Sequence, residues 1–363
     1  MDERIIIHCD LDAFFAAVEI LHHGFDPNTP LIIGSDPQQG KGRGIVSTCN
    51  YAARRYGIRS AMPISEAWRR CPATPFGPGV YIGGTRGLYS RASRKVMDIL
   101  RSSSDQFEQA GIDEAYLEVT QRTEGDWDNA FALARKMQIQ IKEEIGLSAS
   151  FGVAPTKILA KMSSEENKPN GIFRILPNEI SAFFDGRSVR QVPGIGPKTS
   201  TQLSEWGVET VDEMYRLGFL GLQKLSNERF ATWVINLYEG TTSNQLNTFH
   251  QRKSIGKERT FDRDTHDIEF VLAALEKLLH RCVELLQEAQ AGARVIEVKI
   301  RYQGFETYTF QKSIPVAMDD PDVFLRLAQY LFAQNVEFDK PMRLIGIRFS
   351  HLEFIEFRQE TLV

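Results

Sequence analysis

The chain has 363 residues, a formal net charge of −4 and 42% hydrophobic residues, a composition typical of a globular protein with two or more domains. Its four cysteines lack CxxC spacing and nearby histidine clusters, which argues against a zinc site and against a disulfide framework. No stretch approaches the roughly 20 apolar residues of a membrane-spanning helix, so no membrane partner is expected.

The N-terminal half alternates strand and helix patterns. Residues 1–12 predict a buried strand, because the apolar run Ile5–Ile7 is continuous rather than alternating. A mixed region rich in Gly and Pro follows, over residues 13–83. The next predicted elements are a helix over 86–101, two strands within 107–119, a helix over 127–145, a strand over 148–153 and a helix that begins near Pro155. This interleaving fits an antiparallel sheet with helices on one face.

Two acidic patches lie at the ends of predicted strands. Asp10 and Asp12 follow the first apolar run, and Asp113-Glu114 precedes the run Ala115–Val119. Isolated buried carboxylates are costly, so acids beside apolar strands need partners or a metal. Carboxylates brought together from separate strands suit Mg²⁺ and support two-metal phosphoryl or nucleotidyl transfer. We expect these acids to lie on adjacent central strands.

The C-terminal half has two parts with different sequence patterns. Short helices with Gly-containing turns are predicted from Pro177 to about Gly240, and the polar stretch Thr241–His250 predicts a linker. The remainder predicts a β-α-β-β-α-β order, with strands at 253–261, 295–302, 307–314 and 343–352 and helices at 268–289 and 321–334. That order is a second small sheet backed by two helices.

Five motifs in order carry a resemblance to a known family. They are HCDLDAFFAAVE (8–19), GIVSTCNYAARRYGIRSAMP (44–63), GIDEAYLEVT (111–120), NKPNGI (167–172) and VPGIGPKT (192–199). Each motif alone is weak, but together they resemble the Y family of translesion DNA polymerases. The bacterial DNA polymerase IV subgroup is the most similar. The resemblance spans essentially the whole chain.

This resemblance implies an α+β fold shaped as a right hand. Its expected parts are a ferredoxin-like palm (1–12 and 84–176), small fingers (13–83), a helical helix-hairpin-helix thumb (177–242), a linker (243–249) and a β-α-β-β-α-β little finger (250–363). The implied activity is template-directed addition of dNMP to a primer 3′-hydroxyl by two-metal nucleotidyl transfer. Distributive, low-fidelity synthesis without a proofreading exonuclease is expected, with a role in damage bypass and DNA repair.

The resemblance assigns the acids to catalysis and metal binding. It implies that Asp10, Asp113 and Glu114 hold two Mg²⁺ ions, with Mn²⁺ as a substitute, and that the backbone carbonyl of Leu11 also touches a metal. Asp12 is expected to have a structural hydrogen-bonding role. For any one of these acids alone, a surface or capping carboxylate is the better interpretation.

The resemblance also implies a dNTP site. Phe15 aligns with the steric gate that rejects a ribose 2′-hydroxyl, whereas Phe14 is expected in the core. The residues expected to grip the triphosphate supply hydroxyl groups or positive charge; they are Ser47 (the weakest candidate), Thr48, Tyr51, Arg54 and Lys168. Solvated surface charge is the alternative for the two cations.

Primer-template DNA is the expected macromolecular partner. Gly194, Gly196 and Lys198 lie in a predicted hairpin that offers backbone N–H groups to phosphate. Four cations flank Ser254–Gly256 and are expected to follow the DNA backbone, or else to be edge-strand charge; they are Arg252, Lys253, Lys257 and Arg259. Gln359 and Leu362 resemble sliding-clamp anchors, with a frayed terminus as the alternative.

Several features depart from the family pattern or leave other functions open. Residues 36–43 are Gly-rich, longer than the usual turn and expected to be flexible, and residues 162–166 are unusually acidic for a triphosphate site. The negative net charge predicts modest, salt-sensitive DNA affinity. A non-catalytic recruitment factor for DNA or the clamp is one alternative. A nucleotidyl cyclase is the other, but it would need no hairpin module.

Without a signal peptide or paired cysteines, the chain is expected to be cytoplasmic. The resemblance implies a bacterial protein, and the sequence offers no convincing oligomer interface, so a monomer is expected.

Overall fold

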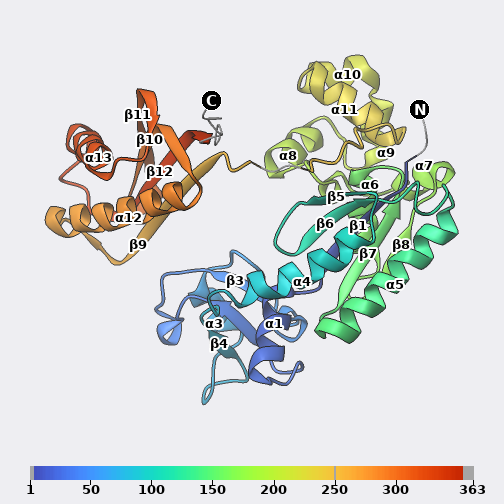
Figure 1. The fold of residues 1–363 in the computed structure, drawn as a ribbon, viewed down its shortest axis with the longest axis horizontal. Helices are drawn as coiled ribbons and strands as arrows, with labels where there is room; N and C mark the ends of the chain where they lie inside the picture. Colours follow the sequence, from blue (N-terminus) through green and yellow to red (C-terminus); the bar gives the residue numbers. More distant parts are fainter. Residues whose placement is uncertain (1–3, 249–250, 355–363) are drawn as a thin grey trace, which may run out of the picture. The chain divides into compact units, whose positions relative to one another are not determined.

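The computed structural model describes residues 4–248 and 251–354, and the chain divides into two compact units, residues 1–249 and 250–363 (Figure 1). The first unit is built on a five-stranded sheet with the order β5-β6-β1-β7-β8. Its strands are β1 (Ile6–Leu11), β5 (Gln106–Gln109), β6 (Glu114–Glu118), β7 (Ala149–Ala154) and β8 (Ile172–Arg174). As predicted, the two acidic patches lie on adjacent strands, because β1 pairs with β6 and places Asp10 opposite Glu114.

Helices cover both faces of this sheet. The helices α4 (Leu88–Ser102) and α5 (Trp127–Ile145) enclose one apolar cluster with alternate β1 residues such as Ile7 and Cys9, while α6 (Lys157–Glu166) packs on the other face. Gly152 of β7 permits this contact, since a Cβ there would lie 2.0 Å from the Ala160 carbonyl oxygen. The prediction of helices on one face is therefore wrong.

The reason is a crossover that the sequence pattern did not predict. Strands β7 and β8 are parallel, and parallel neighbours need a connecting segment such as α6 between them. The expectation of a purely antiparallel sheet is wrong at this edge for the same reason. Burial of β1 on both faces explains its continuous apolar run.

A three-stranded sheet, β3-β2-β4, follows β1 in the chain. This region contains α1 (Phe14–His23), β2 (Leu31–Gly34), β3 (Val46–Cys49), α2 (Tyr51–Arg54), α3 (Ile64–Arg70) and β4 (Val80–Ile82). The Gly-rich segment 36–43 is a hydrogen-bonded turn, in which the amides of Gly40 and Gly42 both donate to the Pro37 carbonyl at 2.8 Å. A Cβ on Gly40 would lie 3.0 Å from the Trp68 ring, so this turn packs against α3, and its expected flexibility stays a prediction.

Short helices complete the first unit, as predicted. They are α7 (Ile180–Phe184), α8 (Pro197–Glu205), α9 (Val211–Arg216), α10 (Gly218–Leu225) and α11 (Glu228–Tyr238), with single turns η2 (Pro177–Glu179) and η3 (Val189–Gln191). Their apolar side chains, including Leu203, Val211 and Val234, join α6 and Ile6 in one core cluster. These helices are therefore anchored to the α6 side of the sheet.

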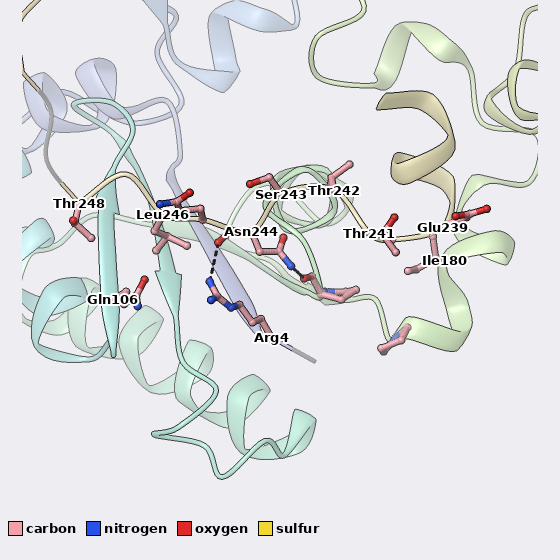
Figure 2. A pocket seen from close by; sticks show the side chains of 14 residues that line it. Arg4, Gln106, Ile180, Glu239, Thr241, Thr242, Ser243, Asn244, Leu246 and Thr248 are labelled. Atoms are coloured by element: carbon pink, nitrogen blue, oxygen red, sulfur yellow. Dashed lines mark hydrogen bonds between the residues drawn. The ribbon is translucent and has the colours of Figure 1, made fainter. Parts of the chain in front are cut away.

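Residues 241–248 cross the surface of the first unit as an extended strap (Figure 2). Leu246 is buried, the Asn244 side chain donates to the Pro155 carbonyl at 2.6 Å, and the Asn247 amide donates to Glu108 at 2.7 Å. The strap borders an open cavity of about 1130 Å³ that also includes Arg4. This part of the predicted linker is thus docked and not free. The predicted division of this unit into palm, fingers and thumb stays a prediction.

The second unit has the predicted β-α-β-β-α-β order. Its elements are β9 (Ser254–Thr265), α12 (Ile268–Glu288), β10 (Ala291–Tyr302), β11 (Thr307–Met318), α13 (Pro321–Asn335) and β12 (Met342–Phe354). The antiparallel sheet has the order β11-β10-β12-β9, and alternate residues such as Val298 and Ile347 pack under α12 and α13. The intervening residues form a polar face without a covering helix from the described part of this unit. Within residues 4–248 and 251–354, no helix has the length and apolar character needed to cross a membrane.

Candidate active site

One cavity gathers nine of the ten residues that were predicted to bind metal or nucleotide. It has a volume of about 280 Å³ and lies where β1 ends. Its lining residues come from β1, α1, β3, α2, α6 and the segments that connect them; they are Asp10, Leu11, Ala13, Phe14, Phe15, Ser47, Thr48, Tyr51, Arg54, Ser60, Asp113, Glu165 and Lys168. Every predicted nucleotide-binding residue is among them, as are the predicted metal ligands other than Glu114.

Backbone pairing brings the acids to this cavity. The Leu11 amide donates to the Asp113 carbonyl at 2.9 Å, which extends the β1–β6 pairing into the turn before β6. Burial raises the pKa of Asp10 and is also the main cause that raises the pKa of Asp113. A nearby cation would therefore stabilise the ionised form of both side chains.

Lys168 provides such a cation. Its ammonium group lies 2.5 Å from Asp10 and 2.6 Å from Glu165, and its side chain is mostly buried. Burial opposes its charge, but the carboxylates, Asp10 first, raise the pKa of Lys168. The acidic segment that seemed unsuited to a triphosphate site thus contributes Glu165 as a partner for this lysine, while Glu166 pairs with Arg187.

Asp12 fixes the loop that carries Lys168. Its carboxylate accepts hydrogen bonds from the Ser150 hydroxyl and from the Asn170 amide, both at 2.8 Å, and the side chain is buried. These bonds join β1, β7 and the loop that carries Lys168. The predicted structural hydrogen-bonding role of Asp12 is confirmed.

Glu114 is turned away from the cavity toward α6. Its Oε2 atom is bonded to the Lys161 ammonium group and lies 3.3 Å from His8 Nε2. The bond from His8, followed by Lys161, lowers the pKa of Glu114 to about 2 against the effect of burial. Burial lowers the pKa of His8, and its Nε2 atom faces the Glu114 carboxylate, to which a proton on Nε2 is donated.

The two phenylalanines of α1 have different surroundings. Phe14 belongs to the core cluster under α4 and α5, which confirms its predicted position, although it also borders the cavity. Phe15 is half-buried, and its ring lies 4.4 Å from the Tyr89 ring, measured between centroids. Tyr89 is held in turn by a hydrogen bond to Glu19, one helical turn after Phe15. The Phe15 ring therefore has a fixed support.

Tyr51 and Arg54 reach the cavity because a helix begins between β3 and α3. The Asn50 side chain caps this helix by accepting from the Ala53 amide at 2.9 Å, and it also accepts from Leu31 of β2. Tyr51 and Arg54 then share one face, as predicted, with the guanidinium 4.6 Å from the Tyr51 ring centroid. Arg54 remains exposed toward solvent.

The donor set of the cavity fits a hard divalent cation. Asp10 and Asp113 offer carboxylate oxygens, the ligands that Mg²⁺ prefers, and the Lys168 ammonium group already occupies a cation position on Asp10. Within residues 4–248 and 251–354, no group of three or more His, Cys, Asp or Glu side chains is close enough to hold an ion as it stands. Glu114 would have to present an oxygen to complete the set.

The predicted phosphate-binding hairpin lies between η3 and α8. Gly194 has a φ of +99°, a conformation that favours glycine, whereas Gly196 has an ordinary φ and open space where a Cβ would project. Lys198 is exposed in the first turn of α8. The buried Leu203 and Val208 close the module as expected. Contact of Gly194, Gly196 and Lys198 with DNA stays a prediction.

The basic stretch of the second unit has an unexpected orientation. Lys257 and Arg259 pair across strands with core residues of β12, so they point to the helix side of the sheet edge, and Arg259 lies over the Phe270 ring of α12. Arg252 and Lys253 are exposed just before β9. DNA contact by these four cations stays a prediction.

The polar face of the second unit carries other cations that the sequence interpretation did not single out. Lys299 pairs with Glu258, and Arg348 lies 3.5 Å from Glu297, so each of these charges is matched across strands. The predicted clamp anchors Gln359 and Leu362 lie outside the described residues.

Comparisons with known proteins identify the family. The sequence model of the impB/mucB/samB family matches residues 9–165, and that of its C-terminal domain matches residues 252–362. A protein named DNA polymerase IV from Methanoculleus marisnigri is 37% identical over 351 residues, which cover 96% of this chain and 95% of that protein. Another from Streptococcus gordonii is 36% identical over 353 residues, with coverage of 96% and 97%.

The chain belongs to the Y family of DNA polymerases.

Solved Y-family structures have the same fold. A chimeric Y-family DNA polymerase built from Dbh and Dpo4 matches with a TM-score of 0.86 and 28% identity, and covers 97% of this chain and 100% of its own. A structure described as an insertion ternary complex of Dbh DNA polymerase matches with a TM-score of 0.67 and 27% identity at the same coverage. The predicted family and the predicted right-hand α+β fold class are confirmed.

The sequence interpretation of this Y-family polymerase missed several residues around the site. Ser60 and Glu165 line the cavity, and His8 and Lys161 hold Glu114. One signal was present for His8, because residues 8, 10 and 12 of a strand share one face. No local pattern pointed to the others.

Proposed function

We propose that this Y-family polymerase adds dNMP units to a primer 3′-hydroxyl as directed by a DNA template, with release of pyrophosphate. The family supports a DNA-directed DNA polymerase, and relatives named DNA polymerase IV are similar over nearly their full length. The single observation that carries the proposal is one cavity in which Asp10 and Asp113 lie together with Phe15, Arg54 and Lys168. Nucleotidyl transfer from a dNTP requires carboxylates that bind cations, a surface that contacts the sugar, and cationic or hydroxyl groups that bind phosphate.

Asp10, Asp113 and Glu114 are the proposed ligands of two Mg²⁺ ions, with the Leu11 carbonyl as a further donor. When bound, Mg²⁺, or Mn²⁺ in its place, lowers the pKa of a coordinated hydroxyl and stabilises charge on phosphate oxygens. The chain itself supplies no side-chain base in this scheme. Its contribution is to hold the primer end and the triphosphate in line.

The triphosphate is held by the cations and hydroxyl groups that line the cavity. Lys168 exchanges its carboxylate partners for phosphate oxygens, a short movement because its ammonium group already lies on Asp10. Arg54 and the hydroxyl groups of Thr48, Tyr51 and Ser47 line the same cavity and supply further donors. Cations and hydroxyl donors together suit the concentrated negative charge of a triphosphate.

Phe15 is the proposed gate against ribonucleotides. Its half-buried ring rests on Tyr89 and faces the cavity, so it cannot retreat into the core as Phe14 does. A ring fixed in this way excludes a 2′-hydroxyl by steric overlap. The polymerase therefore selects deoxynucleotides.

DNA binding is proposed at two separate surfaces. The hairpin before α8 offers backbone N–H groups from the Gly194–Gly196 turn, supported by Lys198. In the second unit, Arg252, Lys253, Lys257 and Arg259, together with the polar sheet face, would contact the backbone. Because cations of that face are paired with carboxylates, DNA affinity is modest and synthesis is distributive.

Family membership supports the wider role: low-fidelity bypass of damaged templates and DNA repair, without a proofreading exonuclease. We further propose a monomer in the cytoplasm, whose terminal Gln359 and Leu362 bind a sliding clamp.

Primer extension tests this proposal. Wild type, Phe15→Ala and the control Phe76→Ala, an exposed ring outside the cavity, are compared with dNTPs and with rNTPs in Mg²⁺. Wild type and the control are expected to extend with dNTPs alone, and Phe15→Ala is expected to accept rNTPs as well. No extension by wild type in Mg²⁺ or Mn²⁺ would favour the non-catalytic recruitment factor.

A further inference from the structure

The Glu114 carboxylate is held by one of its two oxygens. In the described structure, its hydrogen bonds and ion pairs fall on Oε2, from Lys161 Nζ and from His8 Nε2 at 3.3 Å. The donors come from different elements, since His8 lies on β1 and Lys161 lies on α6. The carboxylate is thus fixed between the sheet and the helix, while Oε1 remains available.

His8 is a rigid donor. Its side chain is completely buried, its Nδ1 atom is hydrogen bonded to the Ser164 hydroxyl at 2.8 Å, and its ring lies 4.6 Å from the Tyr116 ring. With a proton on Nε2 the ring donates to Glu114, while Nδ1 stays in hydrogen-bond contact with the Ser164 hydroxyl. Rotation of the ring would break both bonds inside the protein, so the direction of the Nε2–H group is fixed.

Lys161 belongs to a row of charges along one face of α6. Lys157, one turn earlier, pairs with Glu108 at 2.5 Å, and Lys168, beyond the end of the helix, pairs with Asp10 at 2.5 Å. Lys161 occupies the middle position and pairs with Glu114. Glu108, Glu114 and Asp10 are therefore each paired with one of these ammonium groups, and the Glu108 pair lies outside the cavity.

We propose that His8 and Lys161 are positioning residues for Glu114, which hold its Oε2 atom so that Oε1 can receive the divalent cation. This rests on the proposed function, because it assumes that Glu114 is a metal ligand. Carboxylates that bind a metal are commonly oriented by hydrogen bonds from surrounding groups, and loss of those groups weakens metal binding. Without its two anchors, the Glu114 side chain would sample several rotamers and would bind the cation more weakly.

Manganese binding without turnover tests the proposal. Full-length wild type, Lys161→Met, Lys161→Arg and Lys157→Met are mixed with a primer-template whose primer ends in a dideoxynucleotide and with the next dNTP. Bound Mn²⁺ is then measured by electron paramagnetic resonance. Lys161→Met is expected to weaken Mn²⁺ binding about tenfold or more, in the range typical of such groups. Lys161→Arg keeps a donor and is expected to recover most of the affinity.

Lys157→Met is the matched control, because it removes the same charge from the same helix face but leaves Glu114 untouched. Its Mn²⁺ affinity is expected to equal that of wild type. His8→Asn tests the second anchor and is expected to weaken Mn²⁺ binding as Lys161→Met does. Thermal unfolding of each metal-free variant shows whether it is folded.

The proposal is overturned if folded Lys161→Met and His8→Asn bind Mn²⁺ as tightly as wild type, or if Lys157→Met loses as much affinity as Lys161→Met. Tighter binding by Lys161→Met would also overturn it, since Lys161 would then compete with the cation. Failure of the proposed function is distinguishable, because wild type itself would then neither bind Mn²⁺ in this complex nor extend a primer.

Discussion

At the residue scale, Asp12 shows how a buried acid can be structural beside acids that are catalytic. Asp12 accepts hydrogen bonds from the Ser150 hydroxyl and the Asn170 amide, whereas the side-chain partner of Asp10 among the described residues is Lys168, which a ligand can displace. Hydrogen bonds to a charged group that stay inside the protein stabilise the fold. Asp12 therefore fixes the loop that brings Lys168 to the cavity.

Asp12→Ala is expected to lower the free energy of unfolding by about 3 kcal/mol, because two bonds to a carboxylate are lost and the Asn170 amide is left unsatisfied. Urea denaturation measures this change. Asp98→Ala, at an exposed helix position, is the control and is expected to change stability by less than about 0.5 kcal/mol. Equal stability of the two variants would contradict the structural role of Asp12.

Glu19 supports the gate side of the cavity and makes stability depend on pH. Its side chain is buried and accepts from Tyr89 and from the Thr85 amide at 2.7 Å. Burial alone would raise the pKa of Glu19, but these hydrogen bonds lower it below its ordinary value. The ionised form is therefore favoured in the folded state, so its stabilisation is present above the unfolded-state pKa and disappears as pH falls through the folded-state pKa.

Glu19→Gln is expected to be about 1–3 kcal/mol less stable than wild type at neutral pH, and this difference is expected to shrink in acid. Unfolding curves at a series of pH values measure it. Reverse behaviour, with a difference that grows as pH falls, would contradict the assignment. Phe15 is expected to lose part of its support in this variant, because Tyr89 loses its partner.

Sequence motifs predicted which residues line the cavity but not what each of them contacts. Asp10, Phe15 and Lys168 lie within matched motifs, so their positions followed from the resemblance. The partners of Glu114 could not be predicted, because they depend on how α6 packs across the sheet. That packing requires a glycine at position 152, a requirement visible only once helix and strand are placed together.

At the scale of elements, long helices were predicted well and short strands were not. The helix α5 matches its predicted range of 127–145, because Asp126 caps its start and Gly146 ends it. Strand β8 has three residues, too few to show a strand period, and it begins at Ile172, the last residue of the NKPNGI motif. Because β8 was not predicted, the crossover between β7 and β8 was not predicted either, and all helices were expected on one face of the sheet.

The polar face of the second-unit sheet gives a prediction about DNA affinity. Glu258 and Glu297 are paired with Lys299 and Arg348, so these cations are partly withheld from phosphate. The double variant Glu258→Gln/Glu297→Gln is expected to bind duplex DNA more tightly and to steepen the dependence of log K on log salt by up to about 2, since each freed cation adds about 0.9. Fluorescence anisotropy over a range of salt concentrations measures both quantities. An unchanged slope of log K against log salt would show that this face does not contact DNA.

At the scale of the whole molecule, the chain consists of two units joined through a strap that belongs to the first. The strap is fixed by Leu246 and by the bonds of Asn244 and Asn247 to Pro155 and Glu108. Its polar composition predicted a linker, because composition does not reveal a docked backbone. A single buried leucine among polar residues was the one local sign of docking.

Leu246→Ala is expected to weaken the docking by about 2 kcal/mol, because a buried side chain is truncated. Hydrogen exchange at the Asn247 amide, which donates to Glu108, is expected to become faster in this variant. Gln245→Ala changes an exposed neighbour and is expected to leave that exchange unchanged. Equal exchange in both variants would contradict a docked strap.

The cavity at the end of β1 is the proposed site of template-directed nucleotidyl transfer. The most direct measurement is incorporation of each single dNTP opposite each template base in Mg²⁺, by wild type, Asp113→Ala and the control Asp98→Ala. Wild type and Asp98→Ala are expected to insert the complementary nucleotide preferentially, and Asp113→Ala is expected to fall to background. Undiminished insertion by Asp113→Ala, or none by wild type, would contradict the claim.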